Sequence, residues 1–329
     1  MLKYIAKRVI YFIPTLIVIS IVSFLLIELP PGDYLTSYIA ALEARGEMLD
    51  ESGIASLRAR YGLDQPLYLR YLKWITNFVR GDMGQSFEWG LPVSELIWSR
   101  VWLTFVVSLA TMVFTWIIAF PIAIYSATHQ YSLGDYFFSF IGFVGLGVPN
   151  FMIALILLWL AFSYFGADLS GLFSEEYAEA PWSLAKVVDL LKHMWVPLIV
   201  LGTSGAAGLI RTTRANLLDE MRKPYVTTAR AKGLKEGKLL LKYPLRVALN
   251  PFISGIGYAL PALISGSTII SVVLNLPMTG PLLLRALMSQ DMYMAGSFLL
   301  LLSTLTVIGT LLSDILLGVV DPRIRYEES

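Results

Sequence analysis

Few side chains of this protein are of the kinds that perform covalent, redox or metal chemistry. The sequence contains no cysteine, so disulfides, thiolate metal sites and cysteine nucleophiles are excluded. Only His129 and His193 offer an imidazole, which leaves little for a metal site or an acid–base pair. A Ser–His–Asp set or a pair of carboxylates in a soluble pocket cannot be assembled from so few histidines. We therefore predict no catalytic residue, no metal site and no cofactor in this chain.

The nearest match to a phosphate-binding loop is the stretch from Gly233 to Leu239. Its sequence, GLKEGKL, is one residue too short between the glycines and ends in leucine, where Ser or Thr would hold magnesium. The pairs Gly145–Leu–Gly147 and Gly255–Ile–Gly257 lack the third glycine of a dinucleotide-binding loop. The sequence therefore predicts that this chain is not an enzyme.

Positive charge is concentrated in residues 211–247, here called the basic segment, which lies between two long apolar runs. Ten of its residues are Lys or Arg, and only Asp219, Glu220 and Glu236 oppose them. A short loop this basic between membrane spans stays on the cytoplasmic side. This assignment orients the rest of the chain.

A short helix is expected inside the basic segment. Pro224 suits a first helical turn, the residues that follow are helix formers, and Gly233 is placed to end the helix. Such a helix can bind anionic lipid, anchor the bundle or dock into another protein. Its basic residues alternate with small residues rather than with bulky lipid-seeking ones, which favours a groove in a protein partner.

The composition indicates an integral membrane protein. Of the 329 residues, 56% are hydrophobic and 15% charged, and the mean hydropathy is +0.67. Soluble domains carry about a quarter charged residues. Several apolar stretches are also long enough to span a bilayer. The net charge of +1 indicates no partner by itself, and we predict none among nucleic acids.

We predict an all-α fold with six transmembrane helices. The basic residues of the cytoplasmic N-terminus, 1–8, precede an apolar run without a cleavage site, which we interpret as a retained first span. The even number of spans returns the tail, 321–329, to the cytoplasm. The core of the helical bundle is expected over 101–323. The predicted spans are 9–29, 101–127, 136–165, 194–210, 248–274 and 295–320.

Two segments are expected on the outer side. Residues 30–99 begin with a helix-stopping PPGDY and later carry apolar residues at helical spacing. They predict one or two amphipathic helices that lie on the outer membrane surface or cap the bundle. The apolar positions are Leu67, Leu69, Tyr71, Leu72, Ile75 and Phe78. The second outer segment, 166–193, holds an acidic patch at Glu175, Glu176 and Glu179.

Glycine and proline gather in the third predicted span, at Gly142, Gly145, Gly147 and Pro149. Glycines permit close helix packing, and a proline frees a backbone carbonyl, so these residues predict either tight packing or a bend that lines a pore. We name six candidates for a translocation path, for each of which packing is the alternative: Gly147, Pro149, Gly255, Gly257, Ser265 and Ser267.

The sequence TTARAKGL before the fifth predicted span, followed by YPLRVALNP, resembles the cytoplasmic loop of ATP-binding-cassette importer permeases of the dipeptide, oligopeptide and nickel type. In that family the loop holds a Glu-Ala-Ala motif with a glycine four residues later. The corresponding residues here are Thr227, Thr228, Ala229 and Gly233, so threonine replaces the glutamate and the first alanine. The resemblance implies an ATPase-coupling site at Thr227, Thr228, Ala229, Arg230, Ala231, Lys232, Gly233 and Leu234.

The resemblance extends over nearly the whole chain, because the first span with PPGD, the segment YGLDQPLYLRYLKWITNFVRGDMGQSF and the ending DPRIRY also match the family in order. It implies a permease subunit in a bacterial or archaeal inner membrane. The implied partners are a second, similar permease, two cytoplasmic ATPase subunits that bind ATP and Mg²⁺, an outer solute-binding protein and membrane lipid. This chain would seat its short helix in the ATPase.

The solute stays open at this point. The resemblance favours di- and oligopeptides, but related permeases carry oligosaccharides, opines or nickel. Two other kinds of membrane protein are the alternatives. An ion-coupled carrier needs buried charges, and the spans offer only Glu28 and Asp314, for which a structural hydrogen bond is the expected role. A channel would need a ring of selectivity residues, which the sequence does not reveal.

Overall fold

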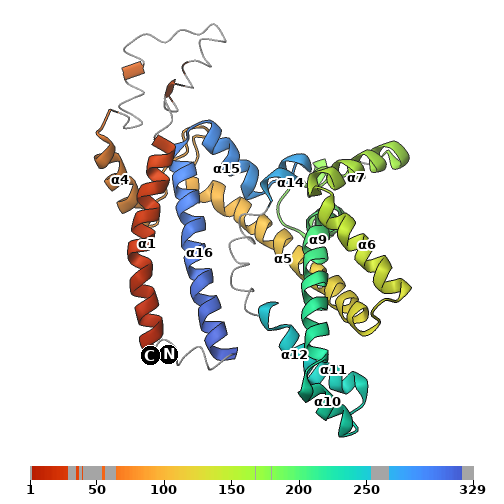
Figure 1. Ribbon diagram of the computed structural model, residues 1–329. Coiled ribbons are helices and arrows are strands. Elements are labelled where there is room, and N and C mark those ends of the chain that lie inside the picture. Colours follow the sequence, from red (N-terminus) through yellow and green to blue (C-terminus); the bar gives the residue numbers. More distant parts are fainter. Residues whose placement is uncertain are drawn as a thin grey trace. The chain divides into compact units, whose positions relative to one another are not determined.

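The structure is a computed structural model that describes residues 2–28, 35–36, 39, 54–55, 64–166, 168–178, 180–252 and 267–320. Within these residues every regular element is an α-helix, apart from one isolated β-bridge between Gln85 and Pro92. Figure 1 shows the helices. Their bounds are α1 (Leu2–Glu28), α4 (Leu67–Val79), α5 (Val93–Thr128), α6 (Leu133–Gly147), α7 (Asn150–Phe165), α8 (Glu175–Ala178), α9 (Leu184–Met221), α10 (Pro224–Ala231), α11 (Glu236–Lys242), α12 (Pro244–Ala248), α14 (Thr268–Val273), α15 (Thr279–Met288) and α16 (Met292–Val320). The predicted all-α architecture is confirmed for this part of the chain.

Some of these helices can cross a membrane by length and composition. Among the described residues, Val93–Thr128 and Met292–Leu311 are long and apolar enough, and α6 with α7 forms a third candidate if the bent pair is one span. A shorter apolar stretch, Ile10–Leu26, lies in α1. These helices support a membrane protein, and the count of six spans stays a prediction.

The chain divides into two compact units. The first comprises the described parts of Met1–Thr104 and Met278–Ser329, and the second those of Phe105–Ile256 and Gly266–Pro277. In the first unit, α1 and α16 lie side by side (Figure 1). The second unit is built on α9, against which α6, α7, α12 and α14 pack.

Helix α4 is anchored in the first unit by an aromatic cluster. The buried Trp74 ring stacks on Phe24 of α1 with centroids 6.0 Å apart, and its Nε1 donates to Ser297 Oγ of α16 at 3.2 Å. Arg70 forms an ion pair with Glu28 at 2.6 Å. Leu67, Leu69 and Leu72 of the predicted apolar pattern are exposed, which is compatible with a helix that lies on the membrane surface. The anchor is therefore Trp74, which that pattern did not include.

The predicted third span, 136–165, contains two helices rather than one. α6 ends at Gly147 and α7 begins at Asn150, and the two axes differ by 100°. Between them Val148 is extended, with φ −92° and ψ 123°. A residue before proline is disfavoured in the helical region, and Pro149 has no amide hydrogen to continue the helix. The Val148–Pro149 pair therefore accounts for the break.

Other helix bounds also differ from the predicted ones. α9 is continuous from Leu184 to Met221, so it extends into both the second outer segment and the basic segment. Residues 275–294, between the fifth and sixth predicted spans, contain α15, which the sequence did not suggest. Of the predicted fifth span, 248–274, residues 253–266 lie outside the described part, and α12 and α14 flank them.

The buried carboxylate of Asp291 holds the turn before α5 against the start of α16. Its oxygens accept from the hydroxyl of Ser86, from the amide of Glu88 at 3.2 Å and from the amide of Met294 at 3.1 Å. The last bond makes Asp291 the N-cap of α16. The carboxylate thus joins two segments that are distant in sequence.

We expect Asp291→Ala to lower the free energy of unfolding by about 2–4 kcal/mol, because it leaves these buried donors without an acceptor. Asp82→Ala is the matched control, since Asp82 is exposed and, among the described residues, accepts a side-chain hydrogen bond only from the amide of Gly84. It should cost at most about 1 kcal/mol. Denaturant unfolding of the detergent-solubilised protein measures both, and equal losses would contradict the anchoring role of Asp291.

Candidate functional site

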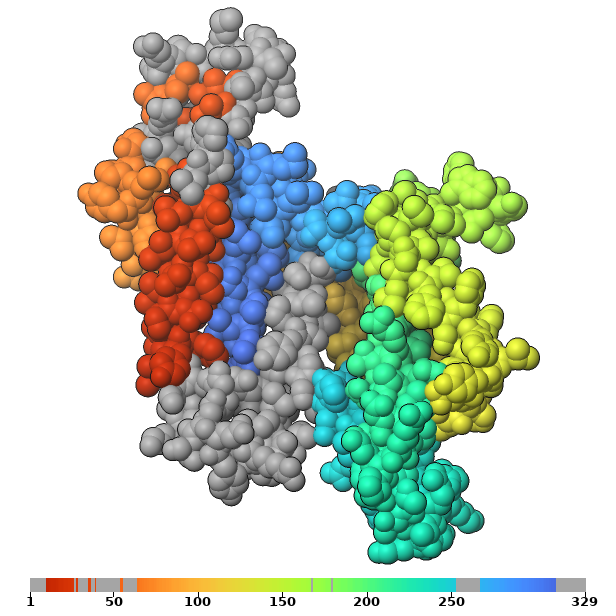
Figure 2. Space-filling view, viewed as in Figure 1, coloured from red at the N-terminus to blue at the C-terminus, as the bar shows by residue number. Residues whose placement is uncertain are grey.

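The basic segment folds as a compact helical corner at one end of α9 (Figures 1 and 2). α9 ends at Met221, Arg222 and Lys223 form the joint, and Pro224 occupies the first turn of α10. Proline suits that position because its missing amide hydrogen would have no helical partner there. The first eleven residues of the predicted loop, 211–221, are therefore the end of α9 rather than loop.

A hydrogen bond closes the joint between α9 and α10. The Tyr225 hydroxyl donates to Glu220 Oε2 at 2.5 Å. Burial and this bond to a carboxylate raise the pKa of Tyr225 to about 12, because both disfavour the phenolate. Tyr225 therefore stays protonated and keeps its bond to Glu220 throughout the physiological pH range.

The inner face of α10 is a small apolar core. Val226 and Ala229 are buried and pack with Leu239 of α11, and the partly buried Leu234 and Tyr243 lie against them. This packing holds α10 and α11 together as one corner. Of the eight predicted coupling residues, Ala229 and Leu234 thus face inward.

Gly233 ends α10 in a left-handed conformation, with φ +80°. Its amide donates to the carbonyl of Arg230 at 3.0 Å, and the amide of Leu234 donates to the carbonyl of Ala229 at 3.5 Å. This pair of bonds, with the apolar contact of Leu234, is a Schellman motif, whose turn position favours glycine. A Cβ at Gly233 would meet nothing within 4 Å, so glycine is needed for its backbone conformation rather than for space.

The outer face of α10 carries the other predicted coupling residues, all of them exposed: Thr227, Thr228, Arg230, Ala231, Lys232 and Gly233. Thr228 turns its hydroxyl back to the carbonyl of Pro224 at 2.9 Å. The Thr228 hydroxyl is therefore satisfied within the helix. Together these residues form an exposed surface of small and basic groups.

Arg230 is not a free cation. Its Nε and Nη2 donate to the two carboxylate oxygens of Glu236 at 2.5 and 3.1 Å, across the corner between α10 and α11. The pairing lowers the pKa of Glu236 and raises that of Arg230. It therefore stabilises the corner at neutral pH and is lost only as the pH falls through the lowered pKa of Glu236. Sequence reasoning missed Glu236, because a spacing of six residues brings side chains together only if the chain turns between them.

The corner is mounted on the ends of two long helices. Leu217 of α9, Ala127 of α5 and Leu245 and Ala248 of α12 form a second buried cluster. Asn216 donates to the carbonyl of Ala248 at 3.5 Å. The corner is therefore packed against the ends of α9 and α5, and only Arg222 and Lys223 separate α9 from α10.

The predicted path residues fall into two groups. Gly147 and Pro149 lie at the α6–α7 break and are exposed, and Ser267 precedes α14. Gly255, Gly257 and Ser265 lie outside the described residues. The packing glycine of the third predicted span is Gly145, where an added Cβ would lie 2.9 Å from Thr203 Cγ2, whereas one at Gly147 would meet nothing within 4 Å. The described residues also contain no group of His, Asp or Glu that could hold a metal ion.

Comparison with known proteins gives a match over almost the whole chain. Residues 119–326 match the family described as the binding-protein-dependent transport system inner membrane component, and residues 1–110 match the N-terminal region of such membrane components. The chain is similar to the oligopeptide transport system permease protein AppB of Bacillus subtilis, with 36% identity over 99% of this chain and 100% of the relative.

Two further relatives have the same extent. The dipeptide transport system permease protein DppB of Alkalihalophilus pseudofirmus is 30% identical over 99% of this chain and 100% of its own length. The glutathione transport system permease protein GsiC of Salmonella typhimurium is 31% identical over the same shares. The family predicted from the basic segment is thus confirmed, and this chain belongs to the inner membrane components of binding-protein-dependent transport systems, the permease subunits of ATP-binding-cassette importers.

Proposed function

We propose that this chain is the permease subunit of an importer for di- and oligopeptides, powered by separate ATPase subunits. The observation that supports it best is the end-to-end similarity to permeases named for oligopeptides, dipeptides and glutathione, which is itself a tripeptide. In this proposal the chain has six spans with both termini in the cytoplasm. It works beside a second permease, two ATPases and a solute-binding protein on the outer side.

The corner formed by α10 and α11, here called the coupling corner, is the proposed contact with the ATPase. Its outer face is exposed and made of small and basic groups, and its inner face is packed onto α11. A docking element needs these two properties. Its exposed face has to fit a groove in the partner, and its packed face has to keep the element in a fixed position. The buried cluster that joins α12 to α9 and α5 supports the fixed position of the corner.

Transport is proposed to follow alternating access. ATP binding would close the ATPase pair and draw the two coupling corners together, and hydrolysis would reset them. The solute path would be lined by the second to fifth spans, with Gly147, Pro149, Gly255, Gly257, Ser265 and Ser267 as candidates. The exposure of Gly147 and Pro149 at a break in the helix supports their assignment, because an irregular backbone in a membrane protein is tolerated where it lines a cavity or is covered by protein.

A matched pair of glycines tests the coupling corner. A Cβ at Gly233 or at Gly237 would meet nothing within 4 Å, but only Gly233 has a positive φ. We expect Gly233→Val to distort the corner, since a β-branched residue in the left-handed region costs about 1–3 kcal/mol. Gly237→Val lies in helix α11, where valine is the better helix former.

The readouts are peptide uptake into proteoliposomes that hold the assembled importer, and ATP hydrolysis stimulated by the binding protein. Gly233→Val should reduce uptake per ATP hydrolysed while the complex still assembles, and Gly237→Val should behave as the unmodified protein. Normal uptake with normal stimulation in Gly233→Val would refute the coupling assignment.

The solute class is tested with the cognate solute-binding protein. We expect it to bind di- and oligopeptides, and we expect the same peptides to compete for uptake by the assembled importer. Isothermal titration with peptides, oligosaccharides and Ni²⁺ measures this directly. Binding of an oligosaccharide or Ni²⁺ without any binding of peptides would replace the solute and leave the permease assignment in place.

A further inference from the structure

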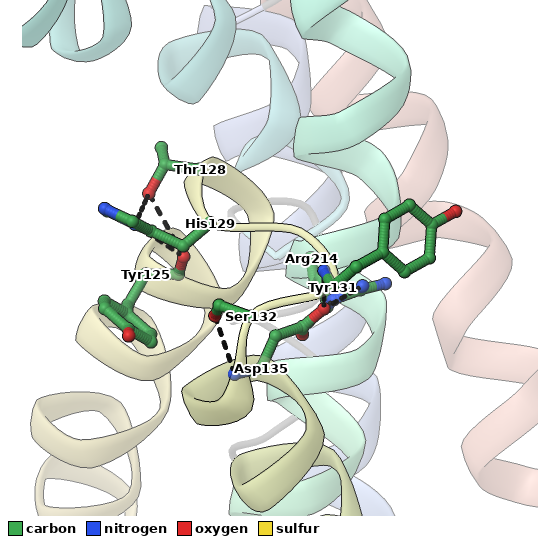
Figure 3. A network of polar contacts seen from close by, with 7 residues as sticks. All are labelled: Tyr125, Thr128, His129, Tyr131, Ser132, Asp135 and Arg214. Carbon is green, nitrogen blue, oxygen red and sulfur yellow. Dashed lines mark hydrogen bonds and ion pairs between the residues drawn. The ribbon is translucent and has the colours of Figure 1, made fainter.

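A partly buried ion pair joins the first turn of α6 to α9 (Figure 3). Arg214 Nε donates to Asp135 Oδ1 at 2.9 Å, and Nη2 donates to Oδ2 at 2.7 Å. The Asp135 side chain is 4% exposed and that of Arg214 25%. A bidentate pair of this kind specifies both the distance and the orientation of the two elements that carry it.

The same carboxylate also shapes the turn that precedes α6. Asp135 Oδ2 accepts from the amide of Tyr131 at 3.0 Å, and the amide of Asp135 donates to Ser132 Oγ, the N-cap of α6, at 3.2 Å. Tyr131 has a positive φ of 67°, which for a residue other than glycine is held by such local bonds. The Asp135 carboxylate therefore joins the turn before α6 to α9, and the Ser132 side chain caps the same end of α6.

At its other end α6 is fastened to α9 a second time. Gly145 lets the two helices approach so closely that an added Cβ would lie 2.9 Å from Thr203 Cγ2. Just past the break, Asn150 Nδ2 donates to Ser204 Oγ at 3.0 Å. α6 is thus attached to α9 at the ion pair and again beside the α6–α7 break.

α9 continues from these two attachments to the coupling corner. Thr203, Arg214 and Leu217 lie in that order on one unbroken helix, and Leu217 belongs to the cluster under the corner. The backbone hydrogen bonds of a helix resist bending, so a displacement of the corner moves Arg214 with it. Because Arg214 holds Asp135, the displacement reaches α6.

We propose that Asp135 and Arg214 are positioning residues for energy coupling, which make α6 move with α9 and so carry a displacement of the coupling corner to the break at Val148–Pro149. The inference rests on the proposed function. A structural role alone would not require this pair, since a buried ion pair is seldom more stable than apolar residues of the same volume. Its bidentate geometry instead couples the position of one helix to that of the other.

The experiment uses the complete importer in proteoliposomes and compares Arg214→Lys with Arg211→Lys. Both variants keep the charge on α9, but Arg211 is exposed and only Arg214 makes the bidentate pair. We expect Arg214→Lys to lower uptake per ATP hydrolysed by about threefold to thirtyfold, the range of coupling changes produced by residues that touch no ligand. Basal ATP hydrolysis and assembly should stay as in Arg211→Lys.

A second readout is independent of transport. Because the chain has no cysteine, spin labels can be placed at exposed Leu133, at the start of α6, and at exposed Lys235, in the coupling corner. We expect one narrow distance distribution in the unmodified protein and in Arg211→Lys, and a broad one in Arg214→Lys. Asp135→Asn should broaden it equally, and the double variant should be no worse than either single variant, since the two residues act as one unit.

The outcomes separate the two hypotheses. If the unmodified importer moves no peptide, the proposed function fails. If the label distances nevertheless respond as expected, the ion pair of Asp135 and Arg214 still fixes α6 to α9. If Arg214→Lys transports with the efficiency of Arg211→Lys and its distance distribution stays narrow, the inference is overturned. Should Arg214→Lys not accumulate, Asp135→Asn gives the same readouts, because asparagine keeps the volume and the acceptor for the Tyr131 amide.

Discussion

Helix α9 is continuous from Leu184 to Met221, although the buried Pro197 has no amide hydrogen to donate within the helix. A helix of this length is stiff, and the second unit uses it as a common support. Its first turns hold the outer segment, its middle packs against α6 and α7, and its last turns carry the coupling corner. This one helix therefore connects the segment that precedes it to the corner formed by α10 and α11.

Buried polar groups along α9 coincide with these attachments. Near its start, Asp189 accepts from the amide and hydroxyl of Ser174 at 2.8 and 2.7 Å, which holds the second outer segment. Lys186 is also buried, and its Nζ donates to the carbonyl of Ala180 at 2.5 Å and lies 4.8 Å from the ring centroid of Phe173. Towards the other end, Arg214 holds Asp135. Burying a charged group is costly unless its polar atoms have partners. Each of these three side chains finds its partners in a segment that packs against α9.

The coupling corner separates two requirements that a single surface could not meet. Val226, Ala229 and Leu239 give it a packed interior, while Thr227, Thr228 and Ala231 offer a surface without long apolar side chains. Gly233 makes the separation possible, because its left-handed conformation reverses the chain while the Schellman bonds satisfy the last carbonyls of α10. The resemblance to a family motif thus has a physical counterpart. Its alanine is the buried contact of the corner, and its glycine is the turn.

The amino-acid sequence alone determined the class of this protein, the helical architecture, the position of the short helix after Pro224 and the glycine that ends it. These properties depend on local composition, on helix signals and on a motif contained in one short stretch, so they can be predicted without a fold. The tertiary structure alone decided which side chains meet. Asp135 and Arg214 are 79 residues apart, Arg230 finds Glu236 only across a reversal of the chain, and Gly145 rather than Gly147 is the close contact with α9. Such pairs depend on how helices cross and turn, and that geometry arises from packing between segments whose separate sequences do not specify it.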